Sequence, residues 1–426
     1  MTGTHKITRE SLLRQLKEKG VRIPCPDSVD IGPEVSPERI SGEGVVVHSG
    51  CKIYGSKTLI LAGAELGYEA PVTLNNCRLG REVRLTGGFF SGSTFLDKAS
   101  MGSGAQVREG CLLEEEARGA HCVGLKHTIL LPFVTLGSLI NFCDCLMGGG
   151  TDSKNHSEVG SSYIHFNYTP NQDKATPSLI GDIPRGVMLK EPPIFLGGQG
   201  GLVGPARIEF GTVVTAGTIV RKDALKKNRM IFTRATASKD MPFHPGLYSN
   251  TKKIIAHNTL YIANLIALRR WYLEVRKNFI KEDSMEKALH HGALETLDLA
   301  IEERLKRLGE VAARMPGSIE TYKKISGERI SHKIISNKKA FYDRWQDMEK
   351  IFRNGLDQPG DLPKRDAFLK VLEKACKQAK KDYLSTIKGL NEKEKDLGTS
   401  WLQGIVDGIY QQIASAVPGF GIQYMA

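Results

Sequence analysis

The chain of 426 residues is long enough for two or three domains, and its composition, 40% hydrophobic and 25% charged, is that of a soluble globular protein. The formal net charge of +12 favours acidic ligands or surfaces, but charge alone does not indicate nucleic-acid binding, and we expect no nucleic-acid partner. None of the eight cysteines forms a Cys-x-x-Cys pair, so we expect free thiols in a reducing compartment and predict no metal site.

The N-terminal segment, residues 1–29, predicts a capping helix followed by a lead-in. The helix is expected over residues 6–20 (KITRESLLRQLKEKG), with Thr8 or Ser11 as its N-cap and Gly20 at its end. The segment lacks the apolar run of a signal peptide, and no stretch of the sequence approaches 18 continuous apolar residues. We therefore expect no membrane span and a cytoplasmic location.

An internal repeat of about six residues runs through residues 30–240. It is clearest in IEFGTV-VTAGTI-VRKD, where Ile208, Val214 and Val220 are evenly spaced. This period fits neither an amphipathic helix nor an alternating strand, but it fits stacked coils with three flat faces and about 18 residues each. A conventional parallel sheet would need crossover helices, which residues 30–150 do not offer. The sequence therefore predicts a mainly-β fold, a left-handed parallel β-helix with insertions.

Arg108 and Lys126 are separated by one coil length in this register. They would occupy the same corner of successive coils, about 4.8 Å apart. Two cations repel each other at that distance unless they are solvated or share an anion. A phosphate clamp is the functional interpretation, since arginine can bind phosphate through two parallel hydrogen bonds. Two solvated surface charges are the ordinary alternative.

Two insertions interrupt the repeat. GGGTDSKNHSEV, between Gly148 and Gly160, is expected to lengthen the solenoid between the cation pair and Asn167. It contains His156, which we consider as a catalytic base, although a histidine in a surface loop is more often only solvated. The second insertion, IPRGVMLKEPP at 183–193, is expected to bulge from the solenoid.

Residues 250–426 predict an α-helical domain in which no chemistry is visible. Apolar residues follow helical spacing from Ile254 to Leu268, and all three tryptophans lie in this region, where helix packing is their ordinary role. We expect this domain to leave the solenoid faces free and to be available to a protein partner. Further helices are predicted over residues 283–312, 318–355, 364–389 and 398–416.

Several segments of the solenoid resemble one known family. They are VREGCLLEEEARGAHCVGLK (107–126), VGSSYIHFNYTPN (159–171), LIGD (179–182), IFLGGQGGLVGP (194–205) and VTAGTIVRKD (214–223). The sequence is similar to the acetyltransferase half of the bifunctional N-acetylglucosamine-1-phosphate uridyltransferase/glucosamine-1-phosphate acetyltransferase family. The resemblance implies a homotrimer that acetylates an amino-sugar phosphate from acetyl-CoA, in the biosynthesis of UDP-N-acetylglucosamine. No LxxGxGTRM-like motif is present, so we do not expect uridylyl transfer by this chain alone.

The resemblance also implies roles for individual residues. Arg108 and Lys126 match the sugar-phosphate-binding pair of the family. Asn167 and Tyr168 match its Asn-Tyr on the acetyl-donor side, and Gly198 lies in a matching segment that we assign to the same side. Arg234, in IFTR, matches a late arginine that contacts the phosphate of coenzyme A.

One departure from the family pattern concerns its catalytic base. The family has a histidine at the start of an HLTYLGD-like turn, whereas this sequence reads SLINFCD, with Ser138 and Asn141 in place of the His and the Tyr. We expect both residues still to line the substrate site, but a serine hydroxyl cannot act as a general base near neutral pH. His156 could restore a base from a new direction.

Three functions therefore stay open. The first is an N-acyltransferase that uses acetyl-CoA or another acyl-CoA on an amino-sugar phosphate or UDP-sugar. The alternative is a non-catalytic module that binds a sugar nucleotide and contacts a partner through its helices. A metal-dependent hydratase would need three histidines that converge between subunits, and the spacing of His121 and His127 places them on neighbouring faces.

Overall fold

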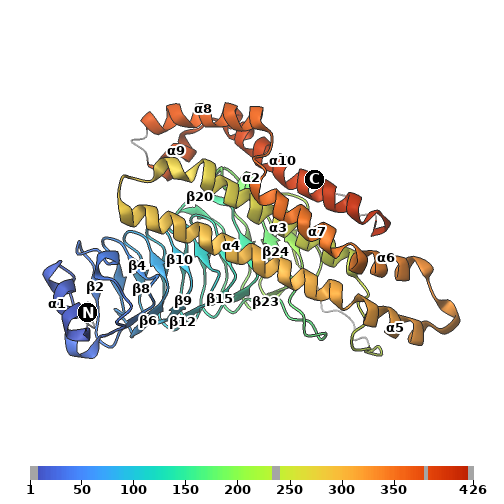
Figure 1. The fold of residues 1–426 in the computed structure, drawn as a ribbon, viewed down its shortest axis with the longest axis horizontal. Helices are drawn as coiled ribbons and strands as arrows, with labels where there is room; N and C mark the ends of the chain where they lie inside the picture. The colour runs from blue at the N-terminus through green and yellow to red at the C-terminus, as the bar shows by residue number, and fades with distance from the viewer. Residues whose placement is uncertain (1–7, 233–239, 379–381, 421–426) are drawn as a thin grey trace, which may run out of the picture.

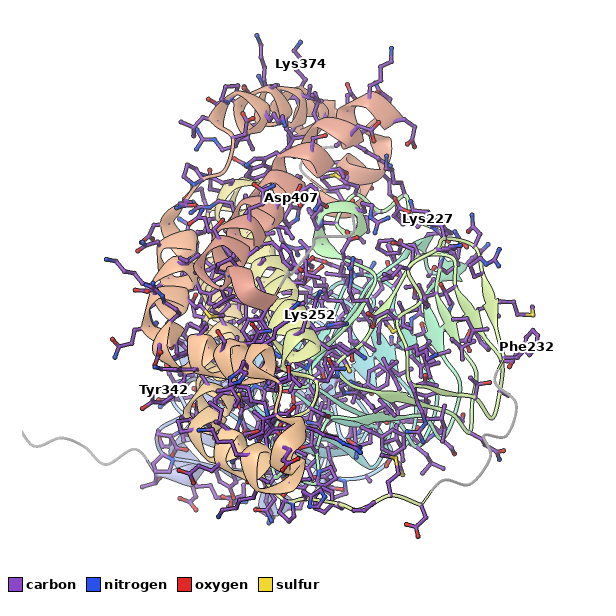
Figure 2. The ribbon with its side chains drawn as sticks, turned by 90° about the vertical axis from the view of Figure 1, so that its right-hand side faces the viewer. Lys227, Phe232, Lys252, Tyr342, Lys374 and Asp407 are labelled. Atoms are coloured by element: carbon purple, nitrogen blue, oxygen red, sulfur yellow. The ribbon has the colours of Figure 1, made fainter. Side chains whose placement is uncertain are left out.

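A computed structural model describes residues 8–232, 240–378 and 382–420. The chain forms a parallel β-helix, and helices from the second half of the sequence lie along one side of it (Figure 1). The predicted left-handed parallel β-helix followed by a helical region is thus confirmed. Viewed end on, Lys227 and Phe232 lie on the solenoid side, whereas Tyr342, Lys374 and Asp407 lie among the helices (Figure 2).

The N-terminal helix α1 (Arg9–Glu18) caps the first coil. The Thr8 side chain accepts a hydrogen bond from the backbone N–H of Ser11, as expected for an N-cap. Leu12, Leu13 and Leu16 are buried in the core of the solenoid, which closes its open end. Short 3-10 helices, η1 (Pro26–Ser28) and η2 (Pro37–Arg39), lead into the coils.

Three parallel sheets form the sides of the solenoid, and the chain visits them in the order I, II, III. Face I consists of β2 (Val46–Val47), β5 (Glu65–Leu66), β8 (Arg84–Leu85), β11 (Ser100–Met101), β14 (Arg118–Gly119), β17 (Thr135–Leu136), β22 (Glu158–Val159), β25 (Phe195–Leu196), β28 (Val213–Val214) and β30 (Met230–Ile231). Face II consists of β1 (Asp30–Ile31), β3 (Lys52–Tyr54), β6 (Val72–Asn75), β9 (Gly88–Ser91), β12 (Ala105–Val107), β15 (Gly124–Lys126), β18 (Asn141–Cys143), β23 (Ile164–Phe166), β26 (Gly201–Val203) and β29 (Ile219–Val220). Face III consists of β4 (Leu59–Ile60), β7 (Arg78–Leu79), β10 (Thr94–Phe95), β13 (Leu112–Leu113), β16 (Ile129–Leu130), β19 (Cys145–Met147), β24 (Ser178–Ile180) and β27 (Arg207–Ile208).

Face III is buried on both sides, and its sequence explains why. Several of its strands carry apolar residues at adjacent positions, as in Leu112-Leu113 and Ile129-Leu130, whereas several strands of face I pair a polar with an apolar residue, as in Glu65-Leu66 and Thr135-Leu136. One residue of each pair points into the solenoid core, and the other joins a second core with the helices. Such continuous apolar runs are typical of strands covered on both faces.

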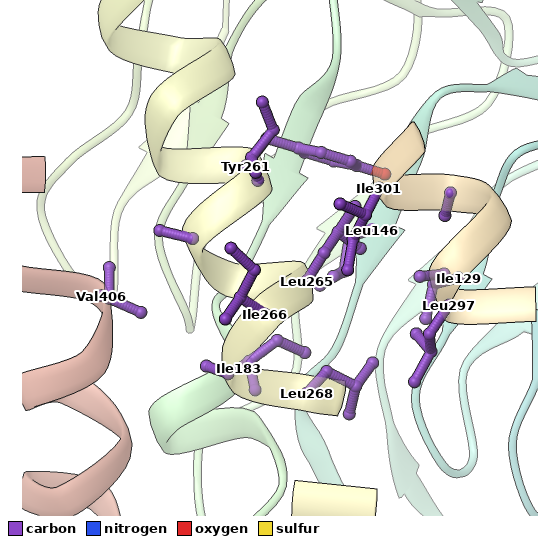
Figure 3. Packing of buried hydrophobic residues seen from close by; sticks show 14 of the residues in the cluster. Ile129, Leu146, Ile183, Tyr261, Leu265, Ile266, Leu268, Leu297, Ile301 and Val406 are labelled. Atoms are coloured by element: carbon purple, nitrogen blue, oxygen red, sulfur yellow. The ribbon is translucent and has the colours of Figure 1, made fainter. Parts of the chain in front are cut away.

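The second core lies between face III and two long helices, α3 (Thr251–Glu274) and α4 (Ser284–Ala313). Leu146 of face III lies beside Leu265 of α3 and Ile301 of α4 (Figure 3). The expectation that the helical region leaves the solenoid faces free is therefore wrong for face III. Apolar helical spacing shows that a helix is buried, but it does not show against what.

The remaining helices pack around α3 and α4 or extend beyond the end of the solenoid (Figure 1). The predicted helix over 318–355 is divided, because Gly327 has a positive φ of 50° after α5 and a further break falls at Arg344. The predicted segment 364–389 contains α8 and α9. These elements are η3 (Arg276–Phe279), α5 (Met315–Ser326), η4 (Gly327–Arg329), α6 (His332–Asp343), α7 (Trp345–Asp357), α8 (Leu362–Gln378), α9 (Tyr383–Gly389), α10 (Glu392–Ala416) and η5 (Pro418–Phe420).

Both insertions leave the solenoid at the corner between faces III and I. The first is an antiparallel hairpin, β20 (Gly150–Asp152) and β21 (Asn155–His156). It adds no coil, contrary to expectation, because β17 pairs directly with β22. The second begins with α2 (Ile183–Gly186) and is buried against α3 and α10, so it is not an exposed bulge.

None of the helices in the described part of the chain has both the length and the hydropathy needed to cross a membrane.

Candidate functional site

The predicted cation pair lies at the corner between faces II and III. Val107 pairs with Leu125, and the backbone N–H of Arg108 donates to the Leu125 carbonyl at 2.8 Å, so Arg108 and Lys126 occupy equivalent places in successive coils. Lys126 Nζ lies 2.7 Å from Glu109 Oε1. The exposed Arg108 guanidinium forms no hydrogen bond or ion pair with any residue that the structure describes.

Cys143 takes the same place in the next coil, because it pairs with Lys126. Burial and the neighbouring Asp144 carboxylate raise the pKa of the Cys143 thiol to about 11, against the opposing effect of the cations Lys174, Lys126 and Arg108. The thiol is therefore neutral at physiological pH. Lys174 therefore joins Lys126 and Arg108 as a cation whose charge acts on the Cys143 thiol.

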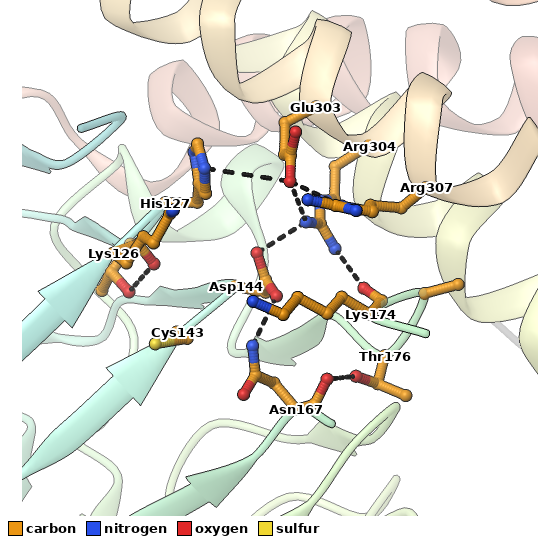
Figure 4. Close-up of polar contacts among 12 residues, drawn as sticks. Lys126, His127, Cys143, Asp144, Asn167, Lys174, Thr176, Glu303, Arg304 and Arg307 are labelled. Carbon is orange, nitrogen blue, oxygen red and sulfur yellow. Dashed lines mark hydrogen bonds and ion pairs between the residues drawn. The ribbon is translucent and has the colours of Figure 1, made fainter. Parts of the chain in front are cut away.

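A buried ion pair supports this corner from below. Asp144 Oδ1 accepts a hydrogen bond from Arg304 Nη2 of α4 at 2.6 Å, and both side chains are almost completely buried. The other carboxylate oxygen, Oδ2, accepts from Asn167 Nδ2 at 2.8 Å (Figure 4). The helical region thus reaches the candidate site through one arginine.

The two histidines next to the cations are turned away from the surface of face II. His127 points toward α4, with Nε2 3.9 Å from Glu303 Oε1, and burial lowers its pKa (Figure 4). His165 points into the coil, where Nδ1 lies 2.6 Å from the Cys143 carbonyl and Nε2 lies 2.8 Å from Ser178 Oγ. Burial lowers the pKa of His165 to about 4, so it is neutral at physiological pH and links two coils.

Asn141 and Tyr168 lie near the cations. Asn141 opens β18 and is exposed on face II, where its Oδ1 accepts a weak hydrogen bond from Cys143 Sγ at 3.7 Å. Asn167 and Tyr168 follow β23 at the II/III corner, and the Tyr168 side chain is 57% exposed. The structure thus brings Asn167 and Tyr168 to the corner that holds Arg108 and Lys126, whereas Asn141 pairs with Gly124 at the opposite end of its strand and contacts the Cys143 thiol.

Ser138 and Gly198 lie at another corner, between faces I and II. The backbone N–H of Ser138 donates to Ser161 Oγ at 3.2 Å. Gly198 packs against the same turn, where an added Cβ would lie 2.7 Å from the Ser161 carbonyl oxygen. Arg234 lies outside the described residues.

His156 lies on the hairpin at the III/I corner, so within one chain it does not meet the cations. Its Nδ1 is 2.9 Å from the Ser153 carbonyl, and its Nε2 is 4.0 Å from Glu158 Oε2. The roles proposed for the candidate residues stay predictions. Their positions form three groups, at the II/III corner, at the I/II corner and, for His156, at the III/I corner.

Lys174, Asp144 and Arg304 were not predicted from the sequence as part of this site. Asp144 is visible in SLINFCD, and Lys174 follows the Asn-Tyr segment, but neither spacing places them beside Arg108. Arg304 carries no sequence signal, because it comes from a helix 160 residues further along the chain.

Among residues 8–232, 240–378 and 382–420, no three His, Cys, Asp or Glu side chains are grouped so that they could hold a metal ion. His121 lies 3.5 Å from Glu69, while His127 faces Glu303, so these two histidines do not converge.

No protein-family model matches the sequence. The chain is similar to the bifunctional protein GlmU of Oleidesulfovibrio alaskensis, at 24% identity over 52% of this chain and 43% of that protein. It is also similar to GlmU of Pelobacter propionicus, at 26% identity over 51% and 42%, and to GlmU of Fervidobacterium nodosum, at 27% identity over 55% and 47%. The chain thus spans less than half the length of these curated relatives.

A solved structure, that of the polysialic acid O-acetyltransferase OatWY, is 14% identical over 52% of this chain and 92% of that one, with a TM-score of 0.16. The fold is therefore identified from the strand pairings of this chain and not from this likeness. The similarity to the GlmU proteins confirms the resemblance of this sequence to that family.

Proposed function

We propose that the II/III corner binds the phosphate of an amino-sugar phosphate or UDP-sugar, and that this chain is an acyltransferase-like protein related to glucosamine-1-phosphate N-acetyltransferase. The observation that carries the proposal is the Arg108 guanidinium, which has no acidic partner among the described residues and lies in register with Lys126. A planar guanidinium with free N–H groups suits a phosphate, which can accept two parallel hydrogen bonds.

The ion pair that holds Lys126 is compatible with ligand binding. Glu109 is about half exposed, and such pairs contribute little stability in water. Although partial burial opposes it, the hydrogen bond from Lys126 lowers the pKa of Glu109, so the carboxylate is ionised at physiological pH. A doubly charged phosphate between Arg108 and Lys126 would compete with this single carboxylate for the ammonium group.

The acyl donor is proposed to be acetyl-CoA or another acyl-CoA. Asn167, Tyr168, Gly198 and Arg234 are the candidates to hold it, a role that rests on their match to the family. Tyr168 offers an exposed ring at the II/III corner, and the close packing of Gly198 against Ser161 leaves no room for a side chain there.

The assembly is proposed to be a homotrimer that forms through the solenoid. Helices cover face III, which leaves faces I and II available. Ile164 and Phe166 are each 41% exposed on face II, and Ile219 lies two strands further along the same face, beyond Gly201. Association through this surface would place a neighbouring subunit beside the cations.

A non-catalytic sugar-nucleotide-binding module is the second candidate. Ser138 replaces the family base, and His156, our candidate for a substitute, lies at the III/I corner. His127 and His165 are turned away from the site as described above. The alternative predicts ligand binding without turnover.

Calorimetry with UDP-N-acetylglucosamine and coenzyme A, combined with a thiol-release assay on glucosamine 1-phosphate, tests both candidates. Binding with acyl transfer supports the enzyme, and binding without transfer supports the module. An absence of binding to both ligands contradicts the proposed site.

A further inference from the structure

The loop over residues 167–177, between β23 and β24, carries three residues of the candidate site: Asn167, Tyr168 and Lys174. In the preceding coil, Asp144 alone separates β18 from β19 at this corner. A loop of this length leaves more backbone N–H and C=O groups outside the sheets, and these need partners when they are buried.

Side chains of Tyr248 and of the helices that follow it donate hydrogen bonds to the loop. Three of them donate to carbonyl groups of the loop, and a fourth donates to a carboxylate within it. The bonds run from Arg304 Nη1 to the Lys174 carbonyl (3.0 Å), from Asn258 Nδ2 to the Ala175 carbonyl (2.9 Å), from Arg314 Nη1 to the Asn171 carbonyl (2.6 Å) and from Tyr248 OH to Asp173 Oδ2 (3.1 Å).

Arg304 makes the most direct connection to the site. One of its nitrogens holds the loop carbonyl at Lys174, and another holds Asp144 Oδ1. Asp144 in turn accepts from the Asn167 amide through its second oxygen. Because a carboxylate paired with arginine only accepts hydrogen bonds, Asn167 must turn its NH₂ group inward and its carbonyl oxygen away from Asp144. Figure 4 shows the extended Lys174 side chain beside Asp144 and Asn167.

We propose that Arg304 is a positioning residue for ligand binding: through Asp144 and the Lys174 carbonyl it fixes the loop 167–177, and the helical region is thereby part of the ligand site. The proposal rests on the proposed function of the II/III corner. Arg304 need not touch the ligand itself, because it acts through Asn167 and Lys174. The helical region then has a role inside this chain, in addition to any contact with a partner.

Two variants of the full chain test the proposal. Arg304→Met alone would leave a buried, unpaired carboxylate, which is strongly destabilising, so it is combined with Asp144→Asn to remove both charges. Arg304→Lys keeps a positive charge beside Asp144, but an ammonium group cannot donate to two acceptors in the planar geometry of a guanidinium. Arg353→Met is the matched control, since Arg353 bridges Glu302 and Glu349 on the helical surface and makes no bond to the solenoid.

The first measurement is hydrogen–deuterium exchange. We expect amides of 167–177 to exchange at least about tenfold faster in the double variant, with Arg304→Lys between it and the wild type, and with unchanged exchange in Arg353→Met. Unchanged exchange of the loop in the double variant would overturn the proposal.

The second measurement is calorimetry with UDP-N-acetylglucosamine at a temperature where circular dichroism shows every variant to be folded. We expect about a tenfold loss of affinity in the double variant, which corresponds to about one well-placed hydrogen bond. In Arg304→Lys we expect a smaller loss. A loosened loop with unchanged affinity would overturn the positioning role. If the wild type binds neither UDP-N-acetylglucosamine nor coenzyme A, the proposed function fails and the positioning role with it, while the exchange data still decide whether Arg304 anchors the loop.

Discussion

Arg108 and Lys126 are linked by the geometry of one coil, and their side chains differ in their present partners. Lys126 is paired with Glu109, whereas Arg108 is exposed and has no partner among the described residues. This difference makes the two positions separable by mutation, because removal of Lys126 also releases a carboxylate at the site.

We expect Arg108→Ala and Lys126→Ala each to weaken the binding of UDP-N-acetylglucosamine. A hydrogen bond to a charged group is worth about 1.5–3 kcal/mol, which corresponds to losses of about 10- to 150-fold. Calorimetry measures the affinities, and Arg118→Ala on face I serves as the control because Arg118 is also an exposed arginine. Wild-type affinity in both site variants would reject the phosphate clamp.

We expect acetyl transfer to glucosamine 1-phosphate to be weak or absent. The resemblance predicts the family's base at the position of Ser138, and the loss of general-base catalysis typically costs about 10²- to 10⁴-fold in rate. The release of free coenzyme A thiol measures turnover. Efficient turnover would contradict this prediction, and His156→Ala would then show whether the hairpin supplies the base.

At the scale of elements, the contact between face III and the end of α3 contains an unusual buried group. The Glu114 side chain is fully buried, and its Oε1 accepts a hydrogen bond from Tyr272 OH at 2.6 Å. Arg276, which also pairs with Glu115, lies nearby. Burial raises the pKa of Glu114 to about 7, against the effect of Arg276.

This pKa makes the attachment of α3 sensitive to pH. A carboxyl group that titrates near pH 7 in the folded chain and near 4.5 in the unfolded chain contributes stability that is present below pH 4.5 and is lost as the pH rises through about 7. We expect Glu114→Gln to reduce the decrease in stability between pH 5 and pH 7. Urea denaturation at both pH values measures the free energy of unfolding. An identical decrease in the wild type and the variant would contradict the assignment of this effect to Glu114.

The solenoid and the helical region pack against each other. The boundaries predicted at 30–240 and 250–426 stay predictions, but the two parts share a core. Leu112, Ile129 and Leu146 on the outer side of face III belong to the same cluster as Trp271 and Trp401 of the helical region. Removal of the helices would expose this apolar row, so the two parts are coupled in stability.

At the scale of the whole molecule, the covered face restricts how copies of the chain can associate. We expect a trimer in solution through the free solenoid faces. Ile164→Asp combined with Phe166→Asp should dissociate it, because charged groups on an exposed apolar surface oppose its burial. Light scattering with size-exclusion chromatography measures the mass of both forms.

Leu299→Asp is the control for this experiment, since Leu299 is 51% exposed on α4, away from face II. A wild-type chain that stays monomeric at micromolar concentration would reject the trimer. A double variant that stays trimeric would instead move the contact to another surface.

The six-residue repeat is enough to predict the solenoid and the register of Arg108 and Lys126. An aliphatic residue every six positions has one packing solution in which every coil is covered, and residues separated by a coil length must then share a corner, as Arg108 and Lys126 do. Only the tertiary structure decided that α3 and α4 cover face III, that the hairpin with His156 leaves at the III/I corner, and that Arg304 reaches Asp144. A repeat can be read from the sequence because it sets the contacts between neighbouring coils. Contacts between residues 160 positions apart depend instead on how two apolar surfaces fit together, and they leave no periodic pattern in the chain.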